Sequence, residues 1–443
     1  MTATANAIAA ENGAAANSAA GRRDLGLKKR YAAERRFRLL GAAAIAIGLF
    51  FLAALLFSVV SKGYTAFWQT SMALDVTFDE AVIDPSAKRD QDANVLLMAN
   101  YPNLARDALV RALGIDDPGK PVLRDVGGMI SNGVRTQLRD RVLADPSIIG
   151  TTQTIWVLAN AEIDSAYKGQ IDLSVDESRR KVNDRQVAWM KDLSGRGILQ
   201  QRFNTGLFTF GASSRPETAG MGVAILGSLY MMMIVLALAL PIGVAASIYL
   251  EEFAPKNRLT DIIEVNINNL AAVPSIVFGL LGLALFINFA GLPRSASLVG
   301  GLVLALMTLP TVIIATRAAL KAVPPSIRSA ALGIGASKMQ MVFHHVLPLA
   351  MPGILTGTII GLAQALGETA PLLLIGMVAF VANYPATPLD PATALPVQIY
   401  MWANEAERAF VERTSGAIII LLVFLAIMNI TAILLRRRFE RRW

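Results

Sequence analysis

The chain has 443 residues, of which 54% are hydrophobic and 17% are charged, and its mean hydropathy is +0.49. Soluble domains carry about 25% charged residues, so this composition predicts extensive lipid-facing surface. The chain contains no cysteine, which excludes disulfides, iron–sulfur clusters and thiolate zinc sites. Its two histidines, His344 and His345, are adjacent, which argues against a histidine metal site or a catalytic triad. Much of the net charge of +8 lies beside apolar segments, where membrane topology explains it better than nucleic-acid binding.

The N-terminal segment predicts a cytoplasmic tail followed by a membrane anchor. Residues 1–38 begin with an Ala-, Asn- and Gly-rich stretch without periodicity, which predicts disorder, and end in a basic cluster. The next 22 residues, 39–60, are apolar and uncharged. At 1.5 Å per residue they extend about 33 Å, enough to cross a hydrocarbon core of about 30 Å. A cleavable signal peptide has a shorter apolar region of about 7–15 residues, so an uncleaved first transmembrane helix is predicted.

Residues 61–218 have a different character from the segments on either side. They mix charges of both signs and contain no long apolar run, which predicts one independent soluble domain. Alternating side chains predict strands at 71–79 and 152–158, and amphipathic periodicity predicts helices at 94–113 and 177–193. Helices and strands together predict an α/β or α+β domain inserted after the first span.

The remainder of the chain predicts five further transmembrane helices, at residues 221–249, 263–289, 298–316, 351–381 and 417–435. The prolines Pro241, Pro274, Pro310 and Pro371 predict kinks within them. The fold class is therefore an all-α polytopic membrane protein with six transmembrane helices and an inserted soluble domain. Residues 219–437 would form its core and residues 438–443 a basic cytoplasmic tail.

The basic residues predict the orientation of the spans. Basic clusters lie near both ends of the chain, and the positive-inside rule places such clusters in the cytoplasm. Six spans put both termini on one side, so the two indications agree. The loops 250–262 and 317–350 would then lie inside, and the domain at 61–218 outside.

The loop between the fourth and fifth predicted spans, residues 317–348, carries the most informative pattern. Ser329-Ala330-Ala331 is followed after three residues by Gly335, and after nine more by His345-Val346-Leu347-Pro348. This spacing resembles the EAA loop of ABC importer permeases, although Ser329 replaces the family's first Glu and His345 its Ile. Small residues in the loop would allow a helix to approach a partner closely. An ordinary amphipathic surface helix is the alternative.

The segments around this loop resemble the phosphate-specific permeases, in particular the A-type subunit (PstA family). The resemblance covers roughly residues 215–437, and the domain at 61–218 looks like an N-terminal periplasmic extension of that core. It is carried by Pro352-Gly353-Ile354-Leu355-Thr356-Gly357, by Ala365-Leu366-Gly367-Glu368-Thr369-Ala370-Pro371, and by Val273-Pro274-Ser275-Ile276-Val277-Phe278-Gly279. It implies the type I ABC importer permease fold. It also implies that a coupling helix docks on a cytoplasmic ATPase, with coupling residues Ser329, Ala330, Ala331, Gly333, Gly335, Leu347 and Pro348.

A translocation pathway is predicted from polar or helix-breaking residues within the spans. Glu368 is the acidic residue placed deep in the C-terminal spans, where an ionisable group is costly, so a role in the pathway or in gating is the hypothesis and a structural acid the alternative. Relatives often have an Arg where this chain has Gln364. Pro274 and Ser275 could unwind a helix at the pathway, although proline kinks are common in membrane helices. The candidate set is Gln364, Gly367, Glu368, Thr369, Pro274, Ser275 and Arg317, the last of which could instead be a positive-inside anchor.

The resemblance implies the function and its partners. The chain would be a permease subunit of an ATP-driven importer of inorganic phosphate in the bacterial inner membrane, working by alternating access. A homologous permease, a cytoplasmic ATPase dimer and a periplasmic phosphate-binding protein would complete the transporter. No Gly-x4-Gly-Lys-Ser/Thr pattern occurs, so ATP would be bound by partner subunits, and neither an enzyme active site, a cofactor nor a metal is expected in this chain.

Three other interpretations remain open at the level of sequence. An ABC permease for sulfate, molybdate or another ligand would share the same loop spacing. A membrane receptor or sensor would explain the anchor and the outside domain but not four further spans. An ion-coupled secondary transporter would need no ATPase, and it would usually contain internal repeats.

Overall fold

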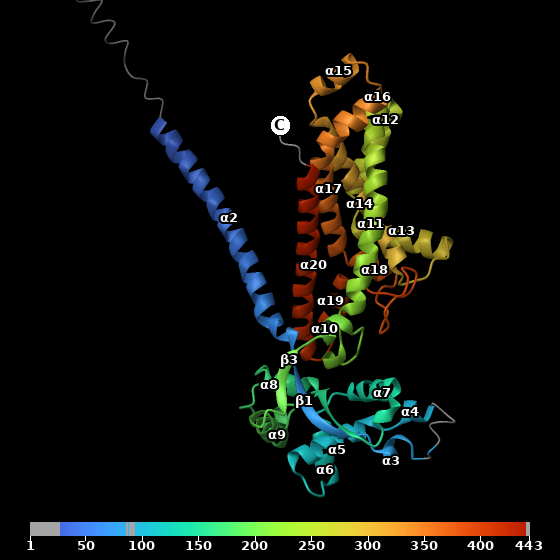
Figure 1. Ribbon diagram of the computed structural model, residues 1–443. Coiled ribbons are helices and arrows are strands. Elements are labelled where there is room, and N and C mark those ends of the chain that lie inside the picture. Colours follow the sequence, from blue (N-terminus) through green and yellow to red (C-terminus); the bar gives the residue numbers. More distant parts are fainter. Residues whose placement is uncertain (1–26, 86, 88–93, 440–443) are drawn as a thin grey trace, which may run out of the picture. The chain divides into compact units, whose positions relative to one another are not determined.

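The computed structural model describes residues 27–85, 87 and 94–439. Residues 1–26 of the predicted tail 1–38 and residues 440–443 of the predicted tail 438–443 lie outside the described residues. The prediction of disorder was wrong for residues 27–38, which are helical and continuous with the first span. The chain divides into two compact units, residues 1–58 and residues 59–443. The described part of the first unit belongs to one long helix, α2 (Leu27–Gly63), which contains the predicted first span. The second unit comprises an α+β domain, residues 64–218, and a helical core, residues 219–439 (Figure 1).

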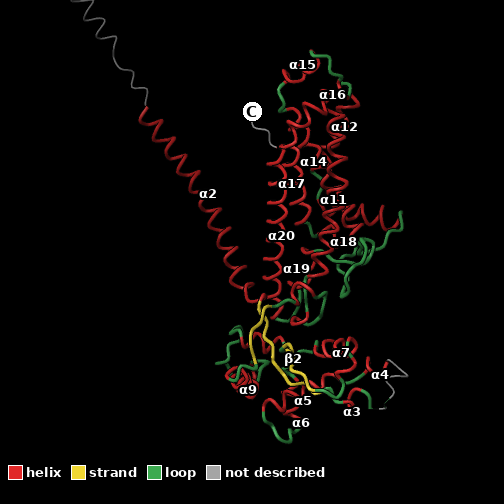
Figure 2. Tube along the Cα trace, viewed as in Figure 1, coloured by secondary structure: helices red, strands yellow, loops and turns green. Residues whose placement is uncertain are grey.

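A three-stranded antiparallel sheet organises the α+β domain (Figure 2). The central strand β1 (Trp68–Thr77) pairs with β2 (Thr152–Leu158) on one side and with β3 (Leu199–Phe203) on the other. The strand predicted at 152–158 is confirmed at both ends, whereas β1 begins three residues before the predicted 71–79. The described part of this domain also contains the helices α3 (Glu80–Ile83), α4 (Asn94–Met98), α5 (Tyr101–Leu113), α6 (Lys120–Gly127), α7 (Val134–Ala144), α8 (Ala161–Tyr167), α9 (Asp184–Gly195) and α10 (Gly206–Thr209), of which the last contacts α11 of the core.

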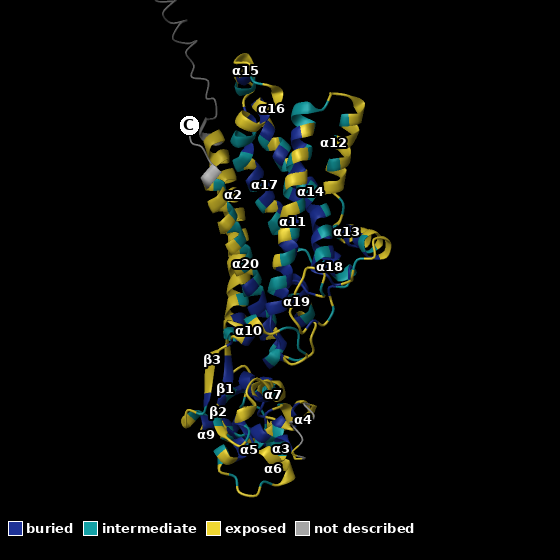
Figure 3. Cartoon of the chain, turned by 45° about the vertical axis from the view of Figure 1, so that its right-hand side comes forward, coloured by how far each residue is buried: buried dark blue, intermediate teal, exposed yellow. Residues whose placement is uncertain are grey.

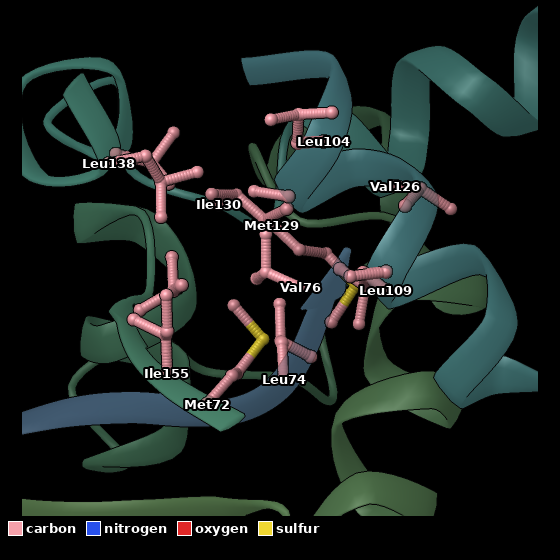
Figure 4. Close-up of a cluster of buried hydrophobic side chains, with 14 of the residues drawn as sticks. Met72, Leu74, Val76, Leu104, Leu109, Val126, Met129, Ile130, Leu138 and Ile155 are labelled. Atoms are coloured by element: carbon pink, nitrogen blue, oxygen red, sulfur yellow. The ribbon is translucent and has the colours of Figure 1, made fainter. Parts of the chain in front are cut away.

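The core of this domain follows from alternation along β1. Met72, Leu74 and Val76 point to one face and are fully buried, where they meet apolar side chains of the helices, including Leu109 and Leu138 (Figure 4). Each predicted amphipathic helix of the domain is split in the structure. The segment 94–113 breaks before α5, whose second residue is Pro102. The segment 177–193 becomes a short 3-10 turn followed by α9, which starts at a capping box formed by Asn183 and Gln186.

The helical core contains ten helices among the described residues. They are α11 (Gly222–Ile248), α12 (Arg258–Ala271), α13 (Ser275–Gly282), α14 (Ser297–Lys321), α15 (Pro325–Gly333), α16 (Lys338–Gln340), α17 (Leu347–Gly367), α18 (Ala370–Leu374), α19 (Leu395–Ala403) and α20 (Ala409–Phe439). With α2, five helices of the described chain are long and apolar enough to cross a membrane, or six if α12 and α13 count as one bent span. The predicted six spans agree with the second count.

Two of the predicted spans are not continuous helices. The segment 263–289 bends by 100° between α12 and α13, because Pro274 adopts an extended conformation (φ −58°, ψ 139°). The segment 351–381 was predicted too long, since α17 ends at Gly367 and only the short α18 follows. Apolar residues continue through both breaks, so hydropathy alone gave no sign of them. By contrast, the spans predicted at 298–316 and 417–435 are shorter than α14 and α20, which contain them.

A stripe of glycines brings α17 against α14. Gly353, Gly357 and Gly361 are spaced four residues apart, so they share one face of the helix. A Cβ added to Gly353 would lie 2.6 Å from the Cβ of Ala319, and one added to Gly361 would lie 2.7 Å from a methyl of Thr308. Only hydrogen fits at these positions, so the backbone of α17 packs directly against small side chains of α14.

Candidate functional site

The predicted coupling helix exists as α15, and Gly335 terminates it. The Gly335 amide donates to the carbonyl of Leu332 (3.0 Å), and the Ala336 amide reaches back to the carbonyl of Ala331 (3.1 Å). Together with a φ of +87° at Gly335, these bonds form a Schellman motif. The spacing between Ala331 and Gly335 therefore has a local cause, since the left-handed residue must directly follow the last turn of the helix.

The predicted coupling residues do not all face the same surroundings. Ser329, Ala330, Gly333 and Gly335 are exposed, whereas Ala331 is buried in the core beneath the helix. Leu347 and Pro348 are half-buried at the start of α17. Beside the exposed residues stand large apolar side chains that face outward; they are Leu332, Ile334, Met339 and Phe343. Ile334, with 81% of its surface exposed, is the most prominent of them, and Figure 3 shows the exposed face of α15.

An arginine on α15 fastens the coupling helix to the core. The Arg328 guanidinium donates to Glu252 Oε1 from Nη2 (2.8 Å) and from Nε (3.1 Å). It also donates to the carbonyls of Val323 (2.6 Å) and Leu320 (2.9 Å), at the C-terminal end of α14. Glu252 lies in the π-helical turn that ends α11. One side chain thus joins α11, α14 and α15, and charge-assisted bonds of this kind are among the strongest in proteins.

Arg317 belongs to a second ion network close to the first. Its guanidinium pairs with Glu264 of α12 and, at 3.5 Å, with Glu251 beside Glu252. Lys321 also pairs with Glu251, at 3.6 Å. Arg317 was predicted as a pathway residue, and the structure places it apart from the rest of that set. Its helix α14 packs antiparallel to α17 with Ala315 and Ala319 opposite Gly357 and Gly353, so roughly 20 Å of helix separate its level from Glu368.

The remaining predicted pathway residues lie at two breaks in the helices. Glu368 follows the end of α17 in an extended conformation, Thr369 precedes α18, and both side chains are partly exposed. Gln364 and Gly367 are exposed on the last turn of α17. Among the described residues, no hydrogen bond or ion pair engages the Glu368 carboxylate. This end of α17 therefore presents an amide and a carboxylate that are free to meet a solute or a partner.

Packing between α13 and α18 brings the two breaks together. A Cβ added to Gly279 of α13 would lie 2.6 Å from the Cα of Pro371, so the two short helices touch through their backbones. The Pro274–Ser275 break starts α13, and the Gly367–Thr369 break precedes α18. Residues about 90 positions apart in sequence thereby form one interrupted region of the core. Broken helices of this kind expose backbone polar groups, as membrane transporters require at their substrate sites.

Sequence reasoning missed three carboxylates and one glycine pattern. Glu251, Glu252 and Glu264 hold the two arginines, and the adjacent pair directly follows an apolar span, which was a usable signal. The spacing of Gly353, Gly357 and Gly361 was equally visible but was not interpreted as a packing face. In addition, none of the residues of α12, all of which the structure describes, is buried, so the side of this helix that faces away from α14 is open to lipid or to another chain (Figure 3).

Two family models match the chain. Residues 239–443 match "Binding-protein-dependent transport system inner membrane component", and residues 24–177 match "Domain of unknown function (DUF3333)". The first match contains α12 to α20, with the coupling helix and both breaks. The second contains α2, β1, β2 and most helices of the α+β domain.

Individual relatives are also similar to this core. "Phosphate transport system permease protein PstA 1" of Mycobacterium tuberculosis (strain CDC 1551 / Oshkosh) is 31% identical over 247 residues, which are 56% of this chain and 76% of the relative. "Phosphate transport system permease protein PstA" of Yersinia pestis is 32% identical, over 49% of this chain and 73% of the relative. Among solved structures, the inward-facing MetNI methionine ABC transporter matches 50% of this chain and 98% of its own, with a TM-score of 0.42 and 17% identity.

Proposed function

Because the chain belongs to the family of PstA phosphate transport system permeases, we propose that it forms half of the membrane pathway of an ATP-driven phosphate importer. A homologous permease would supply the other half. The exposed apolar surface of α12, of α13 and of the π-helical turn that follows α13 supports such a partner, because it includes large side chains such as Ile262, Leu280 and Phe289. Surfaces of this kind face either lipid or another protein.

The proposal rests mainly on one observation: Arg328 attaches the coupling helix α15 to the helical core through an ion pair and hydrogen bonds. The helix α15 exposes Ile334 and its apolar neighbours, while Arg328 ties its other side to α11 and α14. A cytoplasmic ATPase that binds this exposed face would move α15, and the ion pairs would pass the movement to two spanning helices. Opening and closing of the broken region at Glu368 would then give alternating access. The ATP chemistry takes place on the partner, since this chain carries no Gly-x4-Gly-Lys-Ser/Thr pattern.

The proposed orientation places α15 in the cytoplasm and the α+β domain outside. The helix α11 begins next to the α+β domain and ends at the turn that contacts α15, so these two parts lie at opposite ends of a helix of 27 residues. Such a helix is about 40 Å long, more than a bilayer core. Basic residues near both ends of the chain support cytoplasmic termini. A periplasmic phosphate-binding protein would then deliver its ligand on the side of the α+β domain.

Uptake of radiolabelled phosphate tests the substrate. Cells that lack this chain and other phosphate transporters should fail to accumulate phosphate at low external concentration, and expression of the chain should restore uptake. An excess of unlabelled sulfate or molybdate should not compete. Competition by either anion, or unrestored uptake in cells that contain the partner subunits, would show that the substrate is another ligand.

Co-purification of the ATPase tests the coupling surface separately. The substitution Ile334→Glu should abolish both ATPase binding and uptake, because it places a charge in the centre of the apolar contact. Met98→Glu is the matched control, since Met98 is similarly exposed (84%) but lies in the α+β domain. If the Ile334→Glu chain still bound the ATPase, the assignment of α15 as the docking helix would be wrong.

A further inference from the structure

A cluster of buried charges joins the α+β domain to the last transmembrane helix. Lys168, at the end of α8, donates to Asp164 Oδ2 (2.7 Å) and to Glu412 Oε1 (2.9 Å). Glu412 belongs to the first turn of α20. The Lys168 side chain is 2% exposed, and those of both carboxylates are 6% exposed. This ion pair between residues 244 positions apart is therefore shielded from water.

The surrounding groups fix the geometry of the cluster. Asp164 accepts hydrogen bonds from the amide (2.8 Å) and the hydroxyl (2.6 Å) of Thr70 on β1, so its carboxylate cannot swing away from Lys168. Arg413, next to Glu412, is itself buried, and the charges of Asp164, Glu412 and Glu217 act on it. Buried charges are tolerated only when they are paired. Separation of the domain from α20 would leave Glu412 without Lys168 and would take the charges of Asp164 and Glu217 away from Arg413.

A second set of contacts holds the body of the domain to its own last turn, Pro216–Thr218, which leads into α11. The hydroxyl of Ser131 donates to Glu217 Oε1 (3.0 Å), and the Gln69 amide donates to the carbonyl of Glu217 (2.7 Å). Glu217 lies in a turn five residues before α11 begins, and it is 2% exposed. The body of the domain is therefore held both to the turn that leads into α11 and to the first turn of α20. These helices pack against α14 and α17, which carry the ion network and the break at Glu368.

We propose that the α+β domain is a fixed part of the transport machinery and that Lys168 is a positioning residue for transport. By pairing with Glu412, Lys168 sets the position of the first turn of α20, and α20 in turn holds α17. The inference rests on the proposed function as a phosphate permease, but it assigns a role to a domain whose family description gives none. A domain that is only tethered to the core would need no buried ion pair at its base.

The first test is the substitution Lys168→Met, which keeps the length of the side chain and removes its charge. We expect at least a tenfold loss of phosphate uptake at an unchanged amount of chain in the membrane. Lys191→Met is the matched control, because Lys191 is exposed on α9 of the same domain, and its uptake should equal that of the unaltered chain. Normal uptake by the Lys168→Met chain would overturn the proposal.

A disulfide provides the second test, since the chain has no cysteine of its own. A Cβ added to Gly133 would lie 3.8 Å from the Cβ of Thr218, within the range of about 3.5–4.5 Å that disulfides adopt. Gly133 has an ordinary helical φ of −62°, so cysteine is tolerated there. The oxidised Gly133→Cys/Thr218→Cys chain should transport like the unaltered chain, and in the Lys168→Met background oxidation should restore uptake.

The outcomes separate this proposal from the assignment of the substrate. Loss of uptake on oxidation of the double-cysteine chain would mean that the domain must leave its docked position, and the proposal would be wrong. Failure of the disulfide to rescue an inserted, fully oxidised Lys168→Met chain would also contradict it. Absence of phosphate uptake by the unaltered chain would instead show that the assignment of phosphate as the substrate is wrong. The yield of the disulfide, which needs no substrate, reports in either case whether the body of the domain stays against the turn that leads into α11.

Discussion

Arg328 of the coupling helix and Glu252 at the end of α11 are joined by three hydrogen bonds, while the same guanidinium binds two carbonyls at the end of α14. No other side chain type presents donors in this arrangement, because the planar fork of arginine serves a carboxylate and two carbonyls together. The position of α15 relative to two spanning helices therefore depends on this one residue.

We expect Arg328→Lys to uncouple ATP hydrolysis from transport. An ammonium group cannot make all of these bonds, so α15 would bind the ATPase without passing its movement to α11 and α14. Phosphate uptake should fall by tenfold or more while ATPase activity of the purified complex persists. Lys256→Arg, in the exposed loop after α11, serves as the control and should leave the ratio of phosphate to ATP unchanged. A parallel loss of both activities would indicate misfolding rather than uncoupling.

Gly335 and Gly333 form a natural pair for a second prediction. Both have open space around the position of a Cβ, but only Gly335 has a positive φ, of +87°. A side chain at Gly335 costs about 1–2 kcal/mol in the left-handed region and disturbs the end of α15. Gly335→Val should therefore abolish uptake without affecting membrane insertion, and Gly333→Ala should be tolerated. Equal uptake by the two variants would contradict the role of the Schellman motif.

The carboxylate at the break after α17 should matter for transport. Glu368→Gln keeps the shape of the side chain and removes its charge, and we expect uptake to fall by at least tenfold at normal expression. Glu405→Gln alters an exposed acid in the loop before α20 and should have no effect. Initial rates of phosphate uptake at several concentrations would distinguish weaker binding from slower turnover. Unaltered rates for Glu368→Gln would exclude Glu368 from the pathway and from gating.

The buried carboxyl of Glu217 predicts that the stability of the folded protein depends on pH. Burial raises the pKa of its carboxyl above the usual 4.5, and this effect outweighs the hydrogen bond from Ser131 and the charge of Arg215 that favour ionisation. Glu407 raises the pKa further, and the charge of Glu217 also acts on Arg413. Because the folded state prefers the protonated acid, stability contributed by Glu217 should rise as the pH falls through the raised pKa. The gain should end near pH 4.5, where the unfolded chain is also protonated.

Thermal unfolding of the purified protein between about pH 4.5 and 8 would measure this contribution. Glu217→Gln should flatten the dependence, because a neutral amide accepts from Ser131 at every pH. Asp172→Asn is a suitable control, since Asp172 is an exposed acid of the same domain whose pKa is lowered by hydrogen bonds from Ser174. An unchanged pH profile in Glu217→Gln would assign the dependence to another group.

The existence of the spans could be predicted from sequence, but their continuity could not. Long apolar runs located α11, α14 and α20 because a bilayer requires about 20 such residues. Hydropathy does not show whether the chain continues in the same direction, so it could predict neither the bend at Pro274 nor the end of α17 at Gly367. A proline marked one break in advance, although a proline can also lie inside an uninterrupted helix, as Pro310 does in α14.

Tertiary ion pairs explain most of what sequence reasoning missed in the site. Arg317 and Glu264 are 53 residues apart, and Lys168 and Glu412 are 244 apart, so no local pattern connects them. The coupling helix was predictable because its spacing reflects a local rule, the position of a left-handed glycine after the last helical turn. The partners of Arg328 depend on how three helices meet, which only the fold determines.

The glycine face between α14 and α17 limits how the helices of the core can move relative to each other. Where glycine backbone packs against alanine methyl groups, as at Gly353 and Gly357, no side chain with alternative rotamers lies between the helices to let one slide past the other. We therefore expect α14 and α17 to move together as one rigid unit. Any bending must then take place outside this rigid unit. The hinges that the core provides are its π-helical turns, at Tyr249–Phe253, Leu283–Phe289 and Met341–Val346.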